Sequence, residues 1–196
     1  MPIQDINGNN LLHHQNIQQD LSISNIEFCA GKSYFGKREF PSCYTTDLKI
    51  PDISHFMDFP NDYEVQNCHF LDASCDYNNH GLGNRTFEHI IVCNPYGIGF
   101  RGIYETKKFL EIAYDLLIPE GILIIIGSST NLWSKYRNFQ KYYQQLLDSG
   151  ELSINFVSDF EEIDENHNYR LQYQFYHSDL QVQSIPNQII RLRKAA

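Results

Sequence analysis

The stretch Phe87-Glu-His-Ile-Ile-Val-Cys93, followed at once by Asn94-Pro95-Tyr96-Gly97, carries the strongest indication of the fold. Its apolar run is typical of a strand buried inside a parallel sheet. A side-chain amide, a rigid proline and an aromatic ring then arrive together where this strand ends. In open α/β sheets, ligands bind at the carboxyl ends of the strands. The stretch therefore predicts both an α/β sheet and the edge at which its site lies.

The three residues after the predicted strand suit the binding of a planar amino group. The side-chain oxygen of Asn94 and the carbonyl oxygen of Pro95 can each accept a hydrogen bond from an –NH2 group. The ring of Tyr96 can stack on the plane that carries that group. We therefore predict that Asn94, Pro95 and Tyr96 are catalytic and hold a nitrogen acceptor. The competing interpretation is that Asn94-Pro95 only opens a turn.

Composition places the chain among ordinary globular proteins. Its 196 residues are 42% hydrophobic and 14% aromatic, which predicts one domain over residues 1–196 with a full core. It has no apolar run long enough for a membrane span and no basic-then-apolar secretory start. Its five cysteines form no Cys-x-x-Cys pair, and its histidines have no partners at metal-ligand spacing. We expect a cytoplasmic protein with reduced thiols, no metal and no membrane contact.

The charge of the chain bears on its acceptor. It carries 15 Lys and Arg against 24 Asp and Glu, a formal net charge of −9. Proteins that bind nucleic acid neutralise phosphates with Lys and Arg. The composition therefore favours a small-molecule or peptide acceptor over nucleic acid, which would need a locally basic cleft or a partner.

Strand-like and helical segments alternate along the chain, which predicts crossover units. The predicted strands are Ile23–Cys29, Ser42–Thr46, Cys68–Leu71, Phe87–Cys93, Ile122–Ile126, Ile154–Val157, Arg170–Tyr176 and Gln188–Leu192. The predicted helices are Tyr34–Arg38, Tyr104–Leu117 and Leu132–Asp148, and residues 1–22 form either a cap or a flexible segment. We expect a Rossmann-like, mostly parallel sheet with helices on both faces, and an antiparallel pair among the last strands at one edge.

Polar residues follow each of the first three predicted strands. The first runs into Glu27-Phe-Cys-Ala-Gly31-Lys-Ser33, the second ends at Asp47, and the third ends at Asp72. A glycine in the first turn lets a ligand approach the backbone closely. An acid about 20 residues further on can bind ribose hydroxyls, and Asp47 has that spacing from Glu27. The alternative is that the acids are strand-end or capping residues and the glycine serves only a turn.

Residues from about Ile23 to Ser129 resemble the core of class I methyltransferases that use S-adenosylmethionine (SAM). The first motif of that family is commonly Asp/Glu-x-Gly-x-Gly-x-Gly. Here it reads Glu27-x-Cys29-x-Gly31-x-Ser33, so the acid and the middle glycine match while the outer glycines are replaced. Asn94-Pro95-Tyr96 resembles the Asn-Pro-Pro-Tyr motif of the amino-methylating members, with one proline missing.

The resemblance implies SAM as the cofactor and assigns each polar group a role. Asp47 would bind the ribose, and Asp72 would meet the adenine amino group with Ala73 beside it. Tyr96 or Phe100 would supply the ring that stacks on the acceptor. Trp133, at the start of a predicted helix on the ligand edge, either lines the acceptor site or packs in the core. The full set of cofactor-binding residues that it implies is Glu27, Cys29, Ala30, Gly31, Asp47, Asp72, Ala73 and Asn94.

Two other functions remain open at this point. Replacement of the outer glycines by Cys29 and Ser33 would suit a nonenzymatic SAM-fold subunit that acts through a protein partner. A nicotinamide-dependent oxidoreductase shares the first turn and the acid. That class normally carries Gly-x-Gly-x-x-Gly, which is absent here, and it gives Asn94-Pro95 no role.

Overall fold

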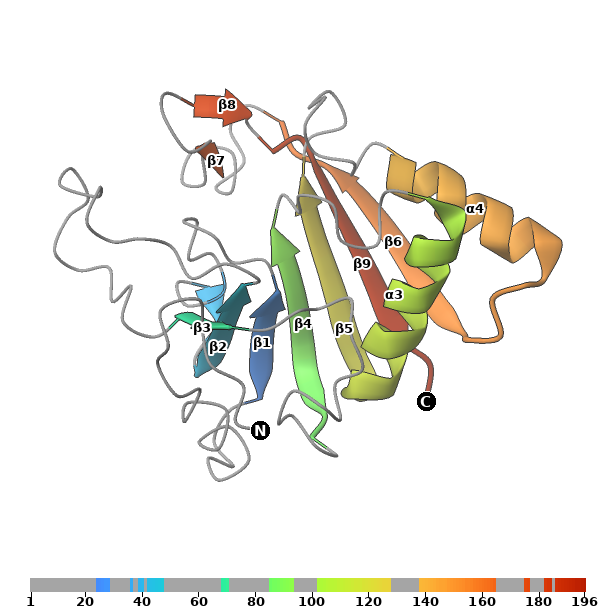
Figure 1. Ribbon diagram of the computed structural model, residues 1–196, viewed down its shortest axis with the longest axis horizontal. Helices are drawn as coiled ribbons and strands as arrows, with labels where there is room; N and C mark the ends of the chain where they lie inside the picture. Colours follow the sequence, from blue (N-terminus) through green and yellow to red (C-terminus); the bar gives the residue numbers. More distant parts are fainter. Residues whose placement is uncertain are drawn as a thin grey trace, which may run out of the picture.

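The computed structural model describes residues 24–28, 36, 39–40, 42–47, 68–70, 85–93, 102–127, 138–164, 175–176, 182–184 and 186–196. These residues build a sheet with two packed helices, shown in Figure 1. The helices are α3 (Ile103–Leu116) and α4 (Phe139–Ser149). The strands are β1 (Asn25–Phe28), β2 (Cys43–Asp47), β3 (Cys68–Phe70), β4 (Phe87–Cys93), β5 (Leu117–Gly127), β6 (Phe156–Glu162), β7 (Phe175–Tyr176), β8 (Val182–Ser184) and β9 (Gln188–Lys194).

The main sheet has seven strands in the order β3-β2-β1-β4-β5-β9-β6, while β7 and β8 form a separate pair. Strands β1 to β5 run parallel to one another. Strand β9 is antiparallel both to β5 and to β6. The predicted mostly parallel, Rossmann-like sheet with an antiparallel C-terminal edge is therefore confirmed.

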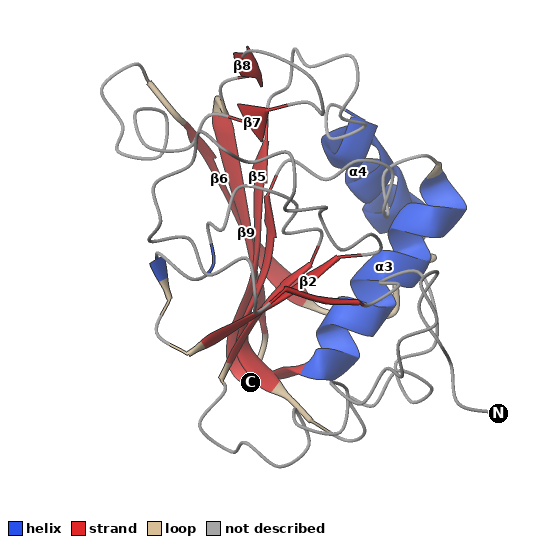
Figure 2. Ribbon diagram, turned by 60° about the vertical axis from the view of Figure 1, so that its left-hand side comes forward, coloured by secondary structure: helices blue, strands red, loops and turns tan. Residues whose placement is uncertain are grey.

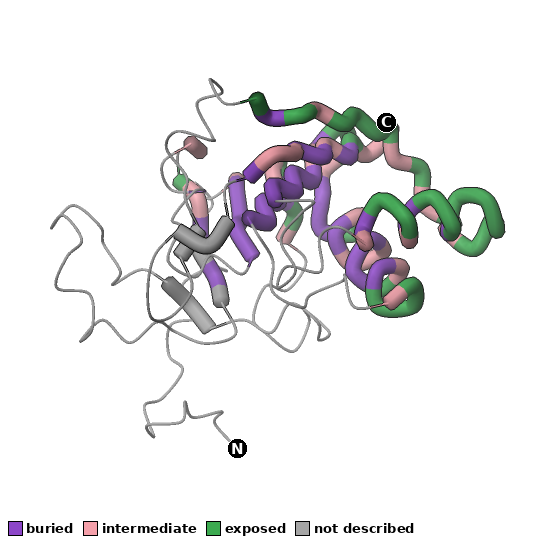
Figure 3. The backbone as a smooth tube through the Cα atoms, turned by 90° about the horizontal axis from the view of Figure 1, so that it is seen from above, coloured by how far each residue is buried: buried purple, intermediate pink, exposed green. Residues whose placement is uncertain are grey.

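One side of the sheet, the helix face, is covered by α3 and α4 (Figure 2). Because side chains alternate along a strand, Ile90 and Val92 lie on this face while Ile91 and Cys93 lie on the other. The helix-face cluster also includes Ile26, Phe28, Leu123, Ile125, Ile190 and Leu192 from the strands, and Phe109, Leu110, Ala113, Leu116, Phe139, Tyr143 and Leu146 from the helices. Figure 3 shows the buried positions gathered along the central strands.

The other side of the sheet, the opposite face, has a smaller apolar cluster. Its buried members are Ile91, Cys93, Ile124, Ile126, Ile163 and Ile189, with Phe40, Cys43 and Ile122 packed against them. Gly36 and Glu39 have helical conformation, and the Phe40 N–H donates to the Gly36 carbonyl at 2.8 Å. A helical turn thus begins within the predicted helix Tyr34–Arg38, whose other residues lie outside the described ones.

The C-terminal end of α3 is completed by a side chain from β9. The last carbonyls of a helix have no partner within the helix, and α3 has no basic residue in its last turn. The ammonium group of Lys194 donates to the carbonyls of Tyr114 at 2.8 Å and Leu117 at 2.7 Å. It also lies 4.5 Å from the centre of the Tyr114 ring. The helix and the sheet are therefore joined by a charged, hydrogen-bonded contact.

Glycine ends α4 in the way the sequence predicts. Gly150 adopts φ 67°, a left-handed conformation, and its N–H donates to the Leu147 carbonyl at 3.1 Å. The predicted start at Leu132 is not tested over its first part, because residues 128–137 lie outside the described residues. Within the described chain, the helix begins at Phe139.

Strand β5 begins earlier than its predicted start at Ile122. We expected Pro119-Glu120-Gly121 to separate helix from strand, but β5 starts at Leu117, directly after α3. Leu117 pairs with Phe87, and the register then shifts between Phe87 and His89. The Pro119–Gly121 segment is thus part of β5 and forms an irregularity in it, with Glu120 at φ 65°.

Bounds of other strands also differ from the predicted ones. The predicted strand Ile154–Val157 is displaced, since β6 runs over Phe156–Glu162, and β8 was not predicted. Strand β4 has the predicted bounds. Residues 1–22, and most of the segment predicted as the strand Arg170–Tyr176, lie outside the described residues.

No helix in the described part of the chain is long and apolar enough to cross a membrane.

Candidate functional site

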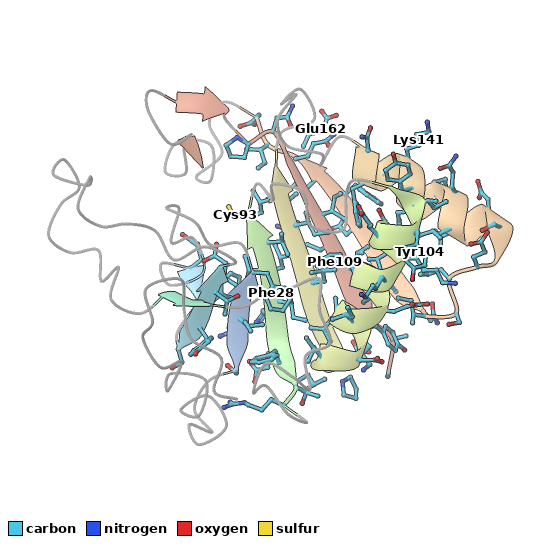
Figure 4. The ribbon with its side chains drawn as sticks, in the orientation of Figure 1. Phe28, Cys93, Tyr104, Phe109, Lys141 and Glu162 are labelled. Carbon is cyan, nitrogen blue, oxygen red and sulfur yellow. The ribbon has the colours of Figure 1, made fainter. Side chains whose placement is uncertain are left out.

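The carboxyl ends of β1 and β4 meet at one edge of the sheet. Glu27 and Phe28 of β1 pair with Ile91 and Val92 of β4, so Cys93 lies just beyond Phe28. Figure 4 labels Phe28 and Cys93 near the upper ends of these neighbouring strands. In sequence, Phe28 directly precedes the predicted cofactor segment, and Cys93 directly precedes the predicted acceptor motif. The topology therefore brings the starting points of both segments together.

Glu27 is the described site residue with the most defined surroundings. Its side chain is fully buried near the end of β1, and its register partner Ile91 places it on the opposite face. One carboxylate oxygen, Oε2, accepts a hydrogen bond from the Gly36 N–H at 2.9 Å. Burial of a carboxylate is costly unless hydrogen bonds compensate, and a bond to a charged group contributes about 1.5–3 kcal/mol. Glu27 thereby fixes the position of a helical turn on β1.

The backbone of Glu27 is also held by β2. The hydroxyl of Thr46, which is buried, donates to the Glu27 carbonyl at 2.9 Å. Asp47, the next residue, is the last of β2 and pairs with Phe70 of β3. The predicted ribose-binding position is thus at the same edge of the sheet as Glu27, one strand away.

Gly36 has no space for a side chain. A Cβ atom there would lie 2.5 Å from the Cys43 sulfur and 2.9 Å from Glu27 Oε2. Gly36 is not among the site residues predicted from the sequence, because the family motif places its close-approach glycine at Gly31. A signal was present: Gly36 falls inside the predicted helix Tyr34–Arg38, where glycine is unfavourable without a packing reason.

A second polar pair supports the other end of the same turn. The Nδ1 atom of His89 and Oδ1 of Asn25 are 2.7 Å apart, and the Asn25 side chain is buried. The Phe40 ring lies 4.9 Å from the His89 ring, tilted by 40°. Burial lowers the pKa of His89 below 6.5, and the nearby Glu88 carboxylate partly opposes this. His89 is therefore mainly neutral at pH 7, and it supports the Phe40 end of the turn.

Most of the predicted site residues are not placed by the structure. Only Glu27 and the backbone of Asp47 belong to the described residues. The others, which lie outside them, are Cys29, Ala30, Gly31, Asp72, Ala73, Asn94, Pro95, Tyr96, Phe100 and Trp133. Their roles stay predictions. Among the described residues, no group of three or more His, Cys, Asp or Glu is arranged to hold a metal ion.

The sheet differs from a dinucleotide-binding sheet in one respect. The nicotinamide-binding fold continues from its fourth strand through parallel fifth and sixth strands. Here the antiparallel β9 is inserted between β5 and β6. The topology therefore weighs against the oxidoreductase alternative.

Comparison with known proteins gives similarity of structure but not of sequence. No protein-family model matches the chain, and no curated protein matches its sequence. An antibiotic-related methyltransferase superposes with a TM-score of 0.55 at 13% identity, over 94% of each chain. The N-methyltransferase NodS from Bradyrhizobium japonicum WM9 superposes with a TM-score of 0.50 at 12% identity, over 94% of this chain and 95% of that one. The chain therefore has the Rossmann-like α/β fold found in these methyltransferases.

Proposed function

We propose that this protein is a SAM-dependent methyltransferase that transfers a methyl group to a nitrogen. The observation that carries the proposal is the sheet order β3-β2-β1-β4-β5-β9-β6 with its reversed β9. This sheet belongs to a chain that superposes on two solved methyltransferases over 94% of its length. The buried Glu27 at the end of β1 adds a chemical feature to the fold.

The described residues fit the cofactor at the level of their chemistry. Carboxylates accept hydrogen bonds from hydroxyl and amino groups, both of which SAM carries. Glu27 lies near the end of β1 and Asp47 ends β2, so two such groups follow neighbouring strands. Asp47 would hold the ribose and Asp72 the adenine amino group. The cofactor would supply an electrophilic methyl group on a sulfonium.

The acceptor would be held by the residues that follow β4. Asn94 and the Pro95 carbonyl would accept hydrogen bonds from an –NH2 group and direct its lone pair at the methyl carbon. Tyr96 would stack on the acceptor plane, with Phe100 and Trp133 as further walls. Catalysis would rest mainly on proximity and alignment, which can lower a barrier by about 7–11 kcal/mol. NodS, which shares the fold, is an N-methyltransferase.

The charge of the protein narrows the class of acceptor. With a net charge of −9, the chain is poorly suited to bare nucleic acid. We therefore propose a small molecule or a peptide that carries a planar amino or amide group.

The cofactor proposal is tested by calorimetric titration with S-adenosylhomocysteine, the demethylated form of SAM. We expect micromolar binding to the wild type and loss of most of it in Asp47→Ala. Asp115→Ala, which changes an exposed acid on α3, is the matched control and should bind like the wild type. A folded wild type that binds no S-adenosylhomocysteine would sink the proposal and favour the nonenzymatic, partner-dependent subunit.

The acceptor proposal is tested separately with Asn94→Ala. Because Asn94 would hold the acceptor as it reacts, turnover should fall far more than S-adenosylhomocysteine affinity. Once an acceptor is found by screening small amines and amides, steady-state kinetics gives the turnover number and titration gives the affinity for S-adenosylhomocysteine. Equal loss of turnover and of cofactor affinity would argue against this role.

A further inference from the structure

We propose that Gly36 is a positioning residue for the cofactor, and that it acts by joining Glu27 to the helical turn Gly36–Phe40. This inference rests on the proposed function, which it deepens by naming what holds the cofactor segment in place. The segment in question, residues 29–35, carries the predicted cofactor residues Cys29, Ala30 and Gly31.

The hydrogen bond between Gly36 and Glu27 fixes the two ends of that segment. Glu27 precedes it on β1, Gly36 follows it, and Gly36 N lies 2.9 Å from Glu27 Oε2. Glu27 is fully buried and Gly36 is buried as well, so water does not compete strongly for the bond. The chain must therefore leave β1 and return to it within nine positions.

Contacts around Gly36 show why the residue has no side chain. Cys43 of β2 and Glu27 of β1 together fill the volume that a Cβ atom would need, at 2.5 Å and 2.9 Å. A larger residue there would have to displace the Cys43 sulfur or the Glu27 carboxyl oxygen that accepts the hydrogen bond. The absence of a side chain at position 36 thus favours the bond.

The far end of the turn is held independently. The Phe40 N–H donates to the Gly36 carbonyl at 2.8 Å, and the Phe40 ring contacts His89 at 4.9 Å. His89 is in turn 2.7 Å from Asn25 on β1. The turn is therefore attached to the sheet at two points, and Gly36 provides the one next to the cofactor segment.

This arrangement assigns Glu27 a task in addition to the one the family motif implies. Its Oε2 accepts a hydrogen bond from the Gly36 N–H, so through this oxygen Glu27 acts on the cofactor by way of the position of the turn. The outer motif glycines, replaced by Cys29 and Ser33, are not needed for this attachment. Gly36 lets the helical turn lie close to β1, which is the kind of close approach that a glycine permits.

Titration of Gly36→Ala with S-adenosylhomocysteine tests the proposal. We expect the dissociation constant to rise by about ten-fold or more. Gly150→Ala is the matched control: it forces alanine into φ 67° at the end of α4, where a Cβ has open space. It should lower the melting temperature while leaving the dissociation constant within roughly two-fold of the wild type. If a general loss of stability were the cause, the dissociation constant would rise to a similar extent in Gly36→Ala and Gly150→Ala.

A rescue variant separates positioning from simple damage. Adding Cys43→Ala to Gly36→Ala removes the contact at 2.5 Å and leaves the one at 2.9 Å, so part of the affinity should return. If Gly36→Ala does not fold, Glu27→Gln keeps the side-chain volume and replaces one carboxyl oxygen with an amide nitrogen. It should weaken S-adenosylhomocysteine binding by several-fold and speed exchange of the Gly36 amide proton, measured by NMR.

The outcomes distinguish this inference from the proposed function. If the folded wild type binds no S-adenosylhomocysteine, both the proposed function and the inference about Gly36 are overturned. If the wild type binds, and folded Gly36→Ala or Glu27→Gln binds equally well, the inference alone is overturned. Loss in both variants, partial return with Cys43→Ala and an unaffected Gly150→Ala would establish it.

Discussion

The two faces of the sheet carry different kinds of side chain. The helix face is a continuous apolar layer between the strands and the helices α3 and α4. The opposite face combines a smaller apolar cluster with polar groups such as Glu27, His89 and Arg191, placed there by their register with Ile91, Ile122 and Ile124. Hydrophobic burial stabilises whatever shape packs well, whereas hydrogen bonds require particular distances. The comparison indicates that the helix face supplies most of the stability and the opposite face supplies the geometry of the candidate site.

The largest expected effect is on stability and comes from the helix face. Leu110 of α3 is fully buried in the helix-face cluster, so Leu110→Ala should cost about 2–5 kcal/mol of unfolding free energy. Urea unfolding measures this loss. S-adenosylhomocysteine affinity should stay within roughly two-fold of the wild type, since Glu27 and its partner Gly36 lie on the other face.

Leu147→Ala on α4 is the control, because its side chain is 43% exposed. It should cost well under half as much as the change at Leu110. A tenfold loss of cofactor affinity in folded Leu110→Ala would show that packing on the helix face also controls cofactor binding, contrary to the comparison above.

A smaller loss is expected where β9 meets α3. Lys194→Met keeps an apolar stem but removes the two hydrogen bonds to the carbonyls of Tyr114 and Leu117. We expect a cost of about 1–2 kcal/mol, measured by urea unfolding. Arg193→Met, which removes an exposed ion pair with Glu120, should cost less. Equal losses of unfolding free energy in the two variants would show that the hydrogen bonds from Lys194 to α3 contribute no more than an exposed ion pair.

The smallest effect is a pH dependence on the opposite face. Burial lowers the pKa of His89 in the folded protein below the unfolded value of 6.5. The unfolded state therefore binds the proton more readily, and stability falls as the pH drops through 6.5 toward the folded pKa. Melting temperatures at about pH 7.5 and about pH 5.5 should differ less in His89→Gln than in the wild type. An identical pH dependence in the two proteins would show that His89 is not protonated differently on unfolding.

The parts of the fold that were predictable are those determined by local pattern. The apolar run of β4 and the glycine after α4 gave correct bounds because each depends on neighbouring residues. The early start of β5 was missed because it depends on Leu117 pairing with Phe87, a contact between distant segments. Strand order is also a property of distant pairings, and the local pattern indicated only that two of the last strands would form an antiparallel pair at one edge.

For the candidate site, the sequence identified Glu27 but not its partner. The acid was visible from its place at the end of a predicted strand. Gly36 could not be assigned from a motif, because its importance comes from Cys43 and Glu27, which approach it only in the folded chain. The roles of Asn94, Pro95 and Tyr96 stay predictions that the experiments above address.

The place of β9 in the sheet has a consequence for synthesis of the protein on the ribosome. Strand β6 is made before β9, yet among the described strands β6 pairs only with β9, which lies between β6 and β5. Until β9 emerges, β5 therefore presents an open edge rich in isoleucine, and such an edge is prone to pair with other chains. Nascent chains stalled before β9 should thus depend on chaperones far more than the completed protein does.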